Sequence, residues 1–251
     1  RTASFEDLKE LGYKAFFIGS GAGLPNFMNI PGENLNGVMS SNEYLTRVNL
    51  MYANQSDSDT PVLRGKCVAV VGGGNTAMDA VRTSKRLGAE RSIIIYRRSR
   101  DEMPARLEEI KHAEEEGIEF MNLANPIEYL PNAEGRVAKV RLQRMKLGEP
   151  DASGRRKPVS IDGDVVEIDI DLAIVAIGVS PNPLIPACLA GLKMSKWGTI
   201  EVNEQTMQSS IPEVFAGGDI VRGGATVILA MGDGRRAAAS MHDYLKNRYN
   251  L

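Results

Sequence analysis

An α/β fold built on a parallel sheet is predicted for this 251-residue chain. Apolar strand-like runs at 66–71 and 92–96 flank a segment whose small apolar residues recur at helical spacing. Glycine-rich turns follow several of the runs, where strands of such sheets end. The composition agrees with this class, since 43% hydrophobic and 25% charged residues are ordinary for a globular chain.

The first third of the chain predicts a helix at 6–11, a short strand at 14–18 and a glycine-rich loop at 19–25. A polar segment at 49–60 then precedes Pro61 and predicts a crossing between domains. The helix after the 66–71 strand should end at Gly88, and its expected buried face is Ala77, Ala80, Val81, Ser84 and Leu87.

A second helix is expected to run to Gly117 with Pro104 in its first turn. Its expected buried stripe is Leu107, Ile110 and Ala113. Residues 118–177 read as three or four strands separated by turns, and a last long helix should begin near Ala225.

Charge and cysteine content exclude several classes of function. Thirty basic and 32 acidic residues give a net charge of -2, which argues against nucleic acid or an anionic membrane as a partner. No apolar stretch approaches the ~18 residues that span a bilayer. Two cysteines exclude a disulfide framework, a zinc ribbon or an iron–sulfur cluster built from this chain alone, and they favour a reducing cytoplasm. The chain begins with Arg1 and shows no secretory leader, so we expect a processed or engineered fragment of a cytoplasmic protein.

The segment from Val68 to Ala77 fits a dinucleotide-binding fingerprint, because a strand, a glycine turn and an amphipathic helix follow one another. Gly72 would permit the tight turn, Gly74 would let the backbone approach a pyrophosphate, and Ala77 would let helix and strand pack closely. The phosphates would then meet free N–H groups at a helix N-terminus. The alternative interpretation is a turn that is tight for structural reasons alone.

The residues after the second strand favour NADPH over NADH. A cofactor with a free 2′-hydroxyl requires an acid about 20 residues beyond the glycines, whereas this chain has Arg97 and Arg98 there. Guanidinium groups match a phosphate, which predicts recognition of the 2′-phosphate. An exposed basic face without a ligand is the alternative.

A separate set of residues predicts contacts with a flavin. An apolar strand is followed by Gly217 and Gly218 and then by the carboxylate of Asp219. A glycine-rich turn then leads into a helix that starts at Ala225. Asp219 would accept a hydrogen bond from a ribityl hydroxyl, and the helix N-terminus would face the pyrimidine edge of the ring. An ordinary strand–turn–helix would have the same spacing.

With these motifs, nearly the whole chain resembles the small, NADPH-oxidising subunit of bacterial glutamate synthase and its relatives. Those relatives include the large subunit of NADH-dependent ferredoxin:NADP oxidoreductase and the corresponding domains of dihydropyrimidine dehydrogenase. The motifs occur in the order of that family, as the segments 19–25, 72–79, 96–99, 102–104, 176–178, 181–182, 216–219 and 225–232.

The resemblance implies particular binding residues and no catalytic side chain, since the cofactors carry the chemistry. For NADPH it implies the pyrophosphate site Gly72, Gly73, Gly74, Asn75, Thr76 and Ala77, with Arg97 and Arg98 at the 2′-phosphate. For FAD it implies Ser20, Gly21, Gly218, Asp219, Ala225, Thr226 and Val227, with Gly178 where the two domains meet.

The departures from the family concern the N-terminal part. Family members begin with a cysteine-rich iron–sulfur segment and a second glycine fingerprint that holds the ADP half of FAD, and this chain has neither. The resemblance therefore implies a Rossmann-like NADPH-binding domain at 46–176, of the type found in flavoproteins with two dinucleotide domains. Parts of an FAD domain would flank it at 1–45 and 177–251, and the iron–sulfur cluster would belong to the missing region.

The implied activity is transfer of electrons from NADPH through FAD and iron–sulfur clusters to a partner that makes glutamate from glutamine and 2-oxoglutarate. That partner would be the glutamate synthase large subunit or another electron-accepting subunit. The absence of a Cys-x-x-Cys pair excludes a thioredoxin-reductase-like dithiol. An NADPH–ferredoxin transhydrogenase subunit and a non-catalytic nucleotide-binding module are the alternatives.

Overall fold

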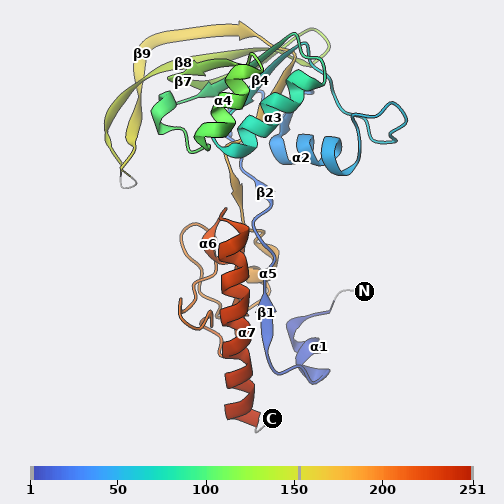
Figure 1. Cartoon of the computed structure of the whole chain (residues 1–251), viewed down its shortest axis with the longest axis vertical. Coiled ribbons are helices and arrows are strands. Elements are labelled where there is room, and N and C mark those ends of the chain that lie inside the picture. Colours follow the sequence, from blue (N-terminus) through green and yellow to red (C-terminus); the bar gives the residue numbers. More distant parts are fainter. Residues whose placement is uncertain (1–2, 152–153, 250–251) are drawn as a thin grey trace. The chain divides into compact units, whose positions relative to one another are not determined.

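The computed structural model describes residues 3–151 and 154–249, and the chain forms two compact units (Figure 1). The central unit is the continuous stretch Pro25–Gly178. The terminal unit consists of Arg1–Leu24 and Val179–Leu251. The central unit is therefore inserted between two pieces of the terminal unit.

The first boundary between the units lies earlier in the chain than the expected position between residues 45 and 46. Strand β3 (Val38–Ser40) pairs in parallel with β10 (Leu172–Val175), which joins residues 25–45 to the central unit. The polar segment 49–60 lies inside that unit, as the end of a π-helical turn followed by loop and turns from residue 51, rather than at a crossing between units. Which cofactor each unit serves stays a prediction.

A five-stranded parallel sheet in the order β3-β10-β4-β5-β6 forms the core of the central unit. Its remaining strands are β4 (Cys67–Val71), β5 (Arg91–Tyr96) and β6 (Glu119–Asn122). The helices of this unit are α2 (Ser41–Leu45), a π-helical turn (Thr46–Leu50), α3 (Asn75–Arg86), a 3₁₀ turn (Arg100–Glu102) and α4 (Leu107–Glu115). An antiparallel sheet adds β7 (Ala124–Pro131), β8 (Val137–Pro150) and β9 (Arg156–Asp169).

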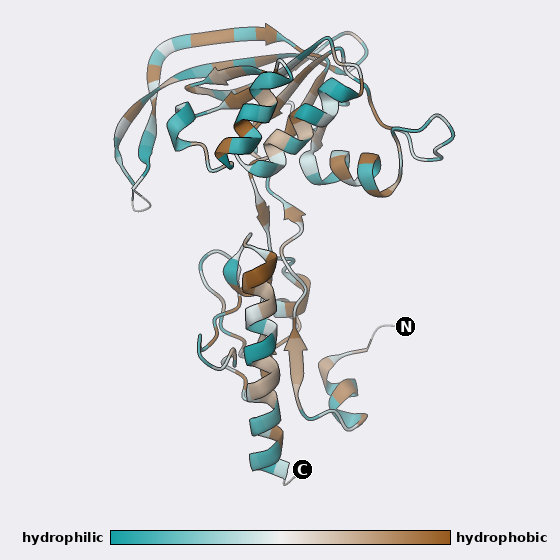
Figure 2. Ribbon diagram, in the orientation of Figure 1, coloured by the Kyte–Doolittle hydropathy of each residue, from teal (hydrophilic) through white to brown (hydrophobic). Residues whose placement is uncertain are grey.

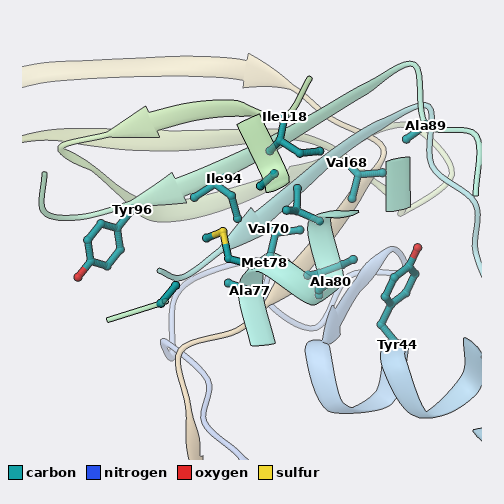
Figure 3. Close-up of a cluster of buried hydrophobic side chains, with 14 of the residues drawn as sticks. Tyr44, Val68, Val70, Ala77, Met78, Ala80, Ala89, Ile94, Tyr96 and Ile118 are labelled. Atoms are coloured by element: carbon teal, nitrogen blue, oxygen red, sulfur yellow. The ribbon is translucent and has the colours of Figure 1, made fainter. Parts of the chain in front are cut away.

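Both faces of the parallel sheet are covered, which explains why its strands are continuous apolar runs. On one face, Val68, Val70 and Ile94 pack with residues of α3 and α4 in one core cluster (Figure 3). On the other face, Ala69 and Ile93 pack with residues of the antiparallel sheet. Strand residues alternate between the two clusters because successive side chains point to opposite faces.

The helix predictions hold with three corrections. Four of the five residues expected on the buried face of α3 are buried, namely Ala77, Ala80, Val81 and Ser84. The fifth, Leu87, is only half-buried, because α3 ends at Arg86. The second helix, α4, begins at Leu107, so Pro104 precedes it rather than lying in its first turn. Leu107 itself is 69% exposed, because the first residue of α4 lies before the turn that packs on the sheet.

The terminal unit is built on a parallel pair of short strands, β1 (Phe16–Ile18) and β12 (Val214–Ala216). Its other elements are α1 (Phe5–Glu10), β2 (Leu24–Pro25), β11 (Val179–Ser180), α5 (Leu184–Ala187), α6 (Asp219–Arg222) and α7 (Val227–Tyr249). The boundary between the units passes through β2, which pairs with β11. Ile18, Val214 and Ile220 form one small core, and Phe215 with Ala237 of α7 forms another. Among the helices that the structure describes, none is long and apolar enough to cross a membrane.

Candidate functional site

The glycine turn between β4 and α3 is held tightly on one side and is open on the other. Gly72 has a φ of 146°, and a Cβ there would overlap the carbonyl oxygen of Ala176. Gly74 is the N-cap residue of α3, and a Cβ there would meet nothing within 4 Å. Gly72 is therefore required by the tight backbone turn, whereas the backbone at Gly74 borders open space. That a ligand occupies this space stays a prediction.

The second glycine of the turn packs on an aromatic ring from the neighbouring strand. A Cβ at Gly73 would lie 2.7 Å from the ring of Tyr96, which ends β5. The Tyr96 hydroxyl donates to the carbonyl of Glu102 at 2.8 Å, and the amide of Ala105 donates to the carbonyl of Gly73 at 3.0 Å. The segment before α4 thus rests on the glycine turn, which the sequence did not predict.

The first turn of α3 presents backbone donors. No side chain caps this helix, and among the described residues the amides of Gly74, Asn75 and Thr76 have no acceptor. Ala77 is fully buried, and its amide donates a hydrogen bond to the carbonyl of Gly74 at 3.0 Å. Free N–H groups at a helix N-terminus form an anion site together with the helix dipole.

The two predicted 2′-phosphate arginines have different surroundings. Arg98 is 6% exposed; its Nε donates to the carbonyl of Arg156 at 2.9 Å, and its guanidinium pairs with Asp151 at 2.6 Å. Arg97 is exposed and makes no hydrogen bond or ion pair with any residue that the structure describes. Arg98 therefore connects β5 to the ends of β8 and β9, and Arg97 is the arginine free to bind a ligand.

A third arginine, which no sequence motif indicated, also lies beside the turn. The amide of Arg106, the N-cap residue of α4, donates to Oδ1 of Asn75 at 2.9 Å. Its side chain is exposed and unpaired within the described part of the chain. Arg100, between β5 and α4, is instead neutralised by Glu114. A cation at a helix N-terminus opposes the helix dipole, so an anion bound there would relieve a local conflict.

A hollow of about 300 Å³ in the terminal unit brings together most of the predicted flavin residues. It is lined by Phe17, Gly19, Gly21, Gly217, Gly218, Asp219, Ala225, Thr226, Val227, Ala230 and Gly234. Ser20, which was also predicted, is an exposed residue that does not line it. Segments distant in the sequence therefore form one concave site, as small-molecule binding requires.

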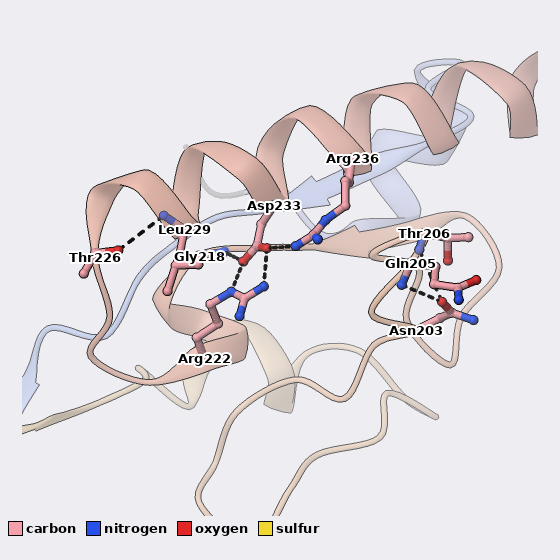
Figure 4. A network of polar contacts seen from close by, with 9 residues as sticks. All are labelled: Asn203, Gln205, Thr206, Gly218, Arg222, Thr226, Leu229, Asp233 and Arg236. Carbon is pink, nitrogen blue, oxygen red and sulfur yellow. Dashed lines mark hydrogen bonds and ion pairs between the residues drawn. The ribbon is translucent and has the colours of Figure 1, made fainter.

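The hollow is bounded by the N-terminal turn of α7. Oδ1 of Asp219 accepts a hydrogen bond from the amide of Ala225 at 3.1 Å. Figure 4 shows the next bond of this turn, in which the Thr226 hydroxyl accepts from the amide of Leu229 at 3.4 Å. Val227 and Ile228 are 75% and 80% exposed, so this hydrophobic end of α7 is not covered by the terminal unit (Figure 2). The sequence expected this helix to begin two residues earlier, at Ala225, and the loop before it also contains the short helix α6.

Asp233 lies behind the hollow and was not singled out in the sequence. It is 0% exposed, and it accepts hydrogen bonds from the Gly218 amide at 3.1 Å and from Arg222 at 2.6 Å (Figure 4). Arg236 pairs with its other oxygen at 2.5 Å. The guanidinium of Arg222 is the main reason that the pKa of Asp233 falls to about 2. The sequence feature that could have indicated a buried role for Asp233 is its place between Gly232 and Gly234 inside an expected helix.

The remaining candidates are spread through the molecule. Gly178 is the last residue of the central unit, with a φ of 105°, and its carbonyl accepts from the amide of Asn26 at 3.1 Å. Cys67 lies in β4, where burial raises the pKa of its thiol, and Cys188 is an exposed residue of the terminal unit. Within residues 3–151 and 154–249, no group of three His, Cys, Asp or Glu residues could hold a metal ion.

The family model described as "Pyridine nucleotide-disulphide oxidoreductase" matches residues 2–234. The chain belongs to this oxidoreductase family. Membership agrees with the glycine turn of the central unit, although the chain carries no Cys-x-x-Cys pair of its own.

Two curated relatives place the chain more closely within the family. A putative glutamate synthase [NADPH] small chain of Cereibacter sphaeroides is 43% identical over 93% of this chain and 56% of its own length. An NADP(+)-dependent formate dehydrogenase subunit beta of Moorella thermoacetica is 41% identical over 93% of this chain and 32% of its own length. The chain thus spans about half of the first relative and about a third of the second, and the resemblance to glutamate synthase small subunits is confirmed.

Among solved structures, Mycobacterium tuberculosis FprA in complex with NADPH has a TM-score of 0.78 and 19% identity, over 98% of this chain and 67% of that chain. At that identity the likeness shows the fold alone. It confirms the predicted α/β class with a Rossmann-like dinucleotide-binding domain.

Proposed function

We propose that this chain is part of an NADPH-oxidising electron-transfer subunit, with NADPH bound at the glycine turn of the central unit. The open space at Gly74, bordered by three unpaired backbone amides, carries this proposal. A pyrophosphate would accept from those amides at the positive end of α3. The tight fit at Gly72 and the buried Ala77 keep the turn close to the helix.

NADPH is favoured over NADH because two unpaired arginines lie at the same edge of the sheet. Arg97 follows β5, and Arg106 is bonded through its amide to the first turn of α3. Strand β5 neighbours β4 in the sheet, on the side where the adenosine ribose of a Rossmann-bound nucleotide lies. Arg98 contributes by holding this edge in place through Asp151, rather than by binding phosphate itself.

The hollow in the terminal unit fits part of an FAD molecule. Asp219 has one carboxylate oxygen without a described partner, and the amides of Val227 and Ile228 are unpaired in the described structure, so both could hold polar flavin groups. The sequence offers no second glycine fingerprint for the ADP half. When bound, FAD would supply the acceptor for hydride from NADPH.

An iron–sulfur cluster does not fit this chain, because cluster sites need about four thiolates and the chain has two cysteines. No step through a cluster is assigned to these residues. The names of the relatives suggest different final electron acceptors. One relative is named a glutamate synthase small chain and the other a formate dehydrogenase subunit. We favour glutamate synthesis with a large partner subunit, in a cytoplasmic enzyme. Transfer to ferredoxin is the alternative acceptor, and nucleotide binding without catalysis the alternative role.

The proposed NADPH site is tested by placing a branched side chain in the open space at Gly74. Gly74→Val should abolish NADPH binding in a fluorescence titration while leaving the melting temperature nearly unchanged, since a Cβ at this position meets no protein atom within 4 Å. Gly23→Val is the matched control, because Gly23 also has open space and an ordinary φ but lies in the terminal unit. Normal NADPH binding by Gly74→Val would show that the turn is only structural.

A further inference from the structure

A single buried carboxylate connects three parts of the terminal unit. Asp233 of α7 is 0% exposed and accepts from the amide of Gly218, from both Nε and an Nη of Arg222, and from Arg236. Gly218 precedes α6 and Arg222 ends it, while Arg236 lies one turn further along α7. We call these three residues, Asp233, Arg222 and Arg236, the Asp233 cluster.

The cluster lies directly behind the wall of the hollow. A Cβ at Gly217 would lie 2.8 Å from the Cβ of Asp233, so the backbone of the 217–218 turn rests on this side chain. Gly217, Gly218 and Asp219 line the hollow, as do Ala230 and Gly234 of α7, whereas Asp233 itself does not. Asp233 thus contacts the wall from the side opposite to any bound molecule.

The segment from Gly218 to Thr226 is otherwise held mainly by local bonds. Within it, the Ala225 amide donates to Asp219, the Gly223 amide donates to the carbonyl of Asp219 at 2.9 Å, and two amides of α6 donate to the carbonyl of Gly218. The middle of α6 is also fixed, because Ile220 is buried and its carbonyl accepts from the amide of Ile200 at 2.9 Å. Gly218 and Gly223 both have a φ of 75°, which only glycine adopts without strain. The two ends of α6 lie next to these glycines and are held through Asp233. The bidentate Arg222–Asp233 pair fixes the last residue of α6, and the bond from the Gly218 amide to Asp233 fixes its N-cap residue.

We propose that Asp233 is a positioning residue for the flavin-binding hollow, an inference that rests on the proposed function. It anchors both ends of α6 against α7, and so sets where Asp219 and the first turn of α7 present their polar groups. Arg222 and Arg236 keep the carboxylate ionised and bonded inside the protein. Asp233 acts on the ligand only through the segment 218–226.

The first test measures amide hydrogen exchange by mass spectrometry in this chain and does not require flavin. Asp233→Asn should accelerate exchange in peptides covering 217–226 at least about tenfold, with β12 and the central unit unchanged. Asp243→Asn, which alters an exposed carboxylate further along α7, is the control and should change nothing. Unchanged exchange at 217–226, or equal acceleration throughout the terminal unit, would overturn the proposal.

A milder variant, Arg222→Gln, keeps the proposal testable if Asp233→Asn does not fold. Arg222→Gln keeps the carboxylate with Arg236 and the Gly218 amide, so it should loosen the same peptides to a smaller extent. If Asp233→Asn does not fold, an Arg222→Gln protein with native exchange at 217–226 would overturn the proposal.

The second test uses the full-length gene product and its affinity for FAD, followed by the visible absorption of the bound flavin. Asp233→Asn should weaken FAD binding at least about tenfold, and it should add little in an Asp219→Ala background, because both changes act through one segment. Fully additive losses would contradict a positioning role. Absence of FAD from the wild-type protein would refute the proposed function instead, while the exchange experiment would still decide the role of Asp233.

Discussion

Replacing Arg97 should separate recognition of the 2′-phosphate from support of the fold. Arg97 is exposed and has no partner among the described residues, so Arg97→Ala removes no intramolecular bond. A charge-assisted hydrogen bond to phosphate contributes ~1.5–3 kcal/mol, which corresponds to a loss of NADPH affinity of roughly 10- to 150-fold. NADH lacks the phosphate, and its affinity should hardly change.

The assay is a calorimetric titration of both cofactors, with Arg98→Ala as the matched comparison. Arg98 is buried and paired with Asp151, so its loss should lower the melting temperature and disturb the ends of β8 and β9. With both arginines replaced, NADPH binding should weaken at least as much as in Arg97→Ala. Equal loss of NADPH and NADH affinity in Arg97→Ala would refute the assignment, as would a large fall in its melting temperature.

Three further predictions concern the terminal unit. Gly234→Leu should fill the hollow and prevent flavin binding in the full-length protein, whereas Gly232→Leu, on the same helix but outside the hollow, should not; equal flavin affinity of the two variants would contradict the site. The pKa of Asp233 is lowered to about 2 by its arginines, so the stability that it contributes is complete above its ordinary value of 3.8 and is lost as pH falls from about 4 to 2. That contribution is about 2 kcal/mol, and acid unfolding of Asp233→Asn should lack this part of the pH dependence. The 251-residue chain purified alone should be colourless and should not oxidise NADPH, and an absorption spectrum showing stoichiometric FAD would contradict this expectation.

The central unit was largely predictable because its signals are local. A strand, a glycine turn and a small-residue helix follow one another within 66–86, and each has its own periodicity or turn chemistry. The backbone positions of Gly72 and Gly74 depend on that segment alone, so the turn followed from their spacing, and the binding role of Gly74 stays a prediction. The hollow was also foreseen in part, since Asp219 and the residues before α7 are close in sequence.

Features that depend on distant partners were not predictable. Arg98 is buried by Asp151, 53 residues away in the chain, and no local pattern distinguishes it from Arg97. The boundary near Pro25 follows from the pairing of β3 with β10, which are separated by most of the central unit. Asp233 is buried in a helix whose other faces are mostly exposed, and only the fold brings Arg222 to it.

The proposed function depends on NADPH binding at the N-terminus of α3 in the central unit. Hydrogen exchange of individual amides with and without NADPH, followed by nuclear magnetic resonance, measures this binding at the site itself. We expect protection of Gly74, Asn75 and Thr76, whose amides have no acceptor among the described residues, and a change at Arg97. Protection confined to the terminal unit, or no protection at saturating NADPH, would contradict it.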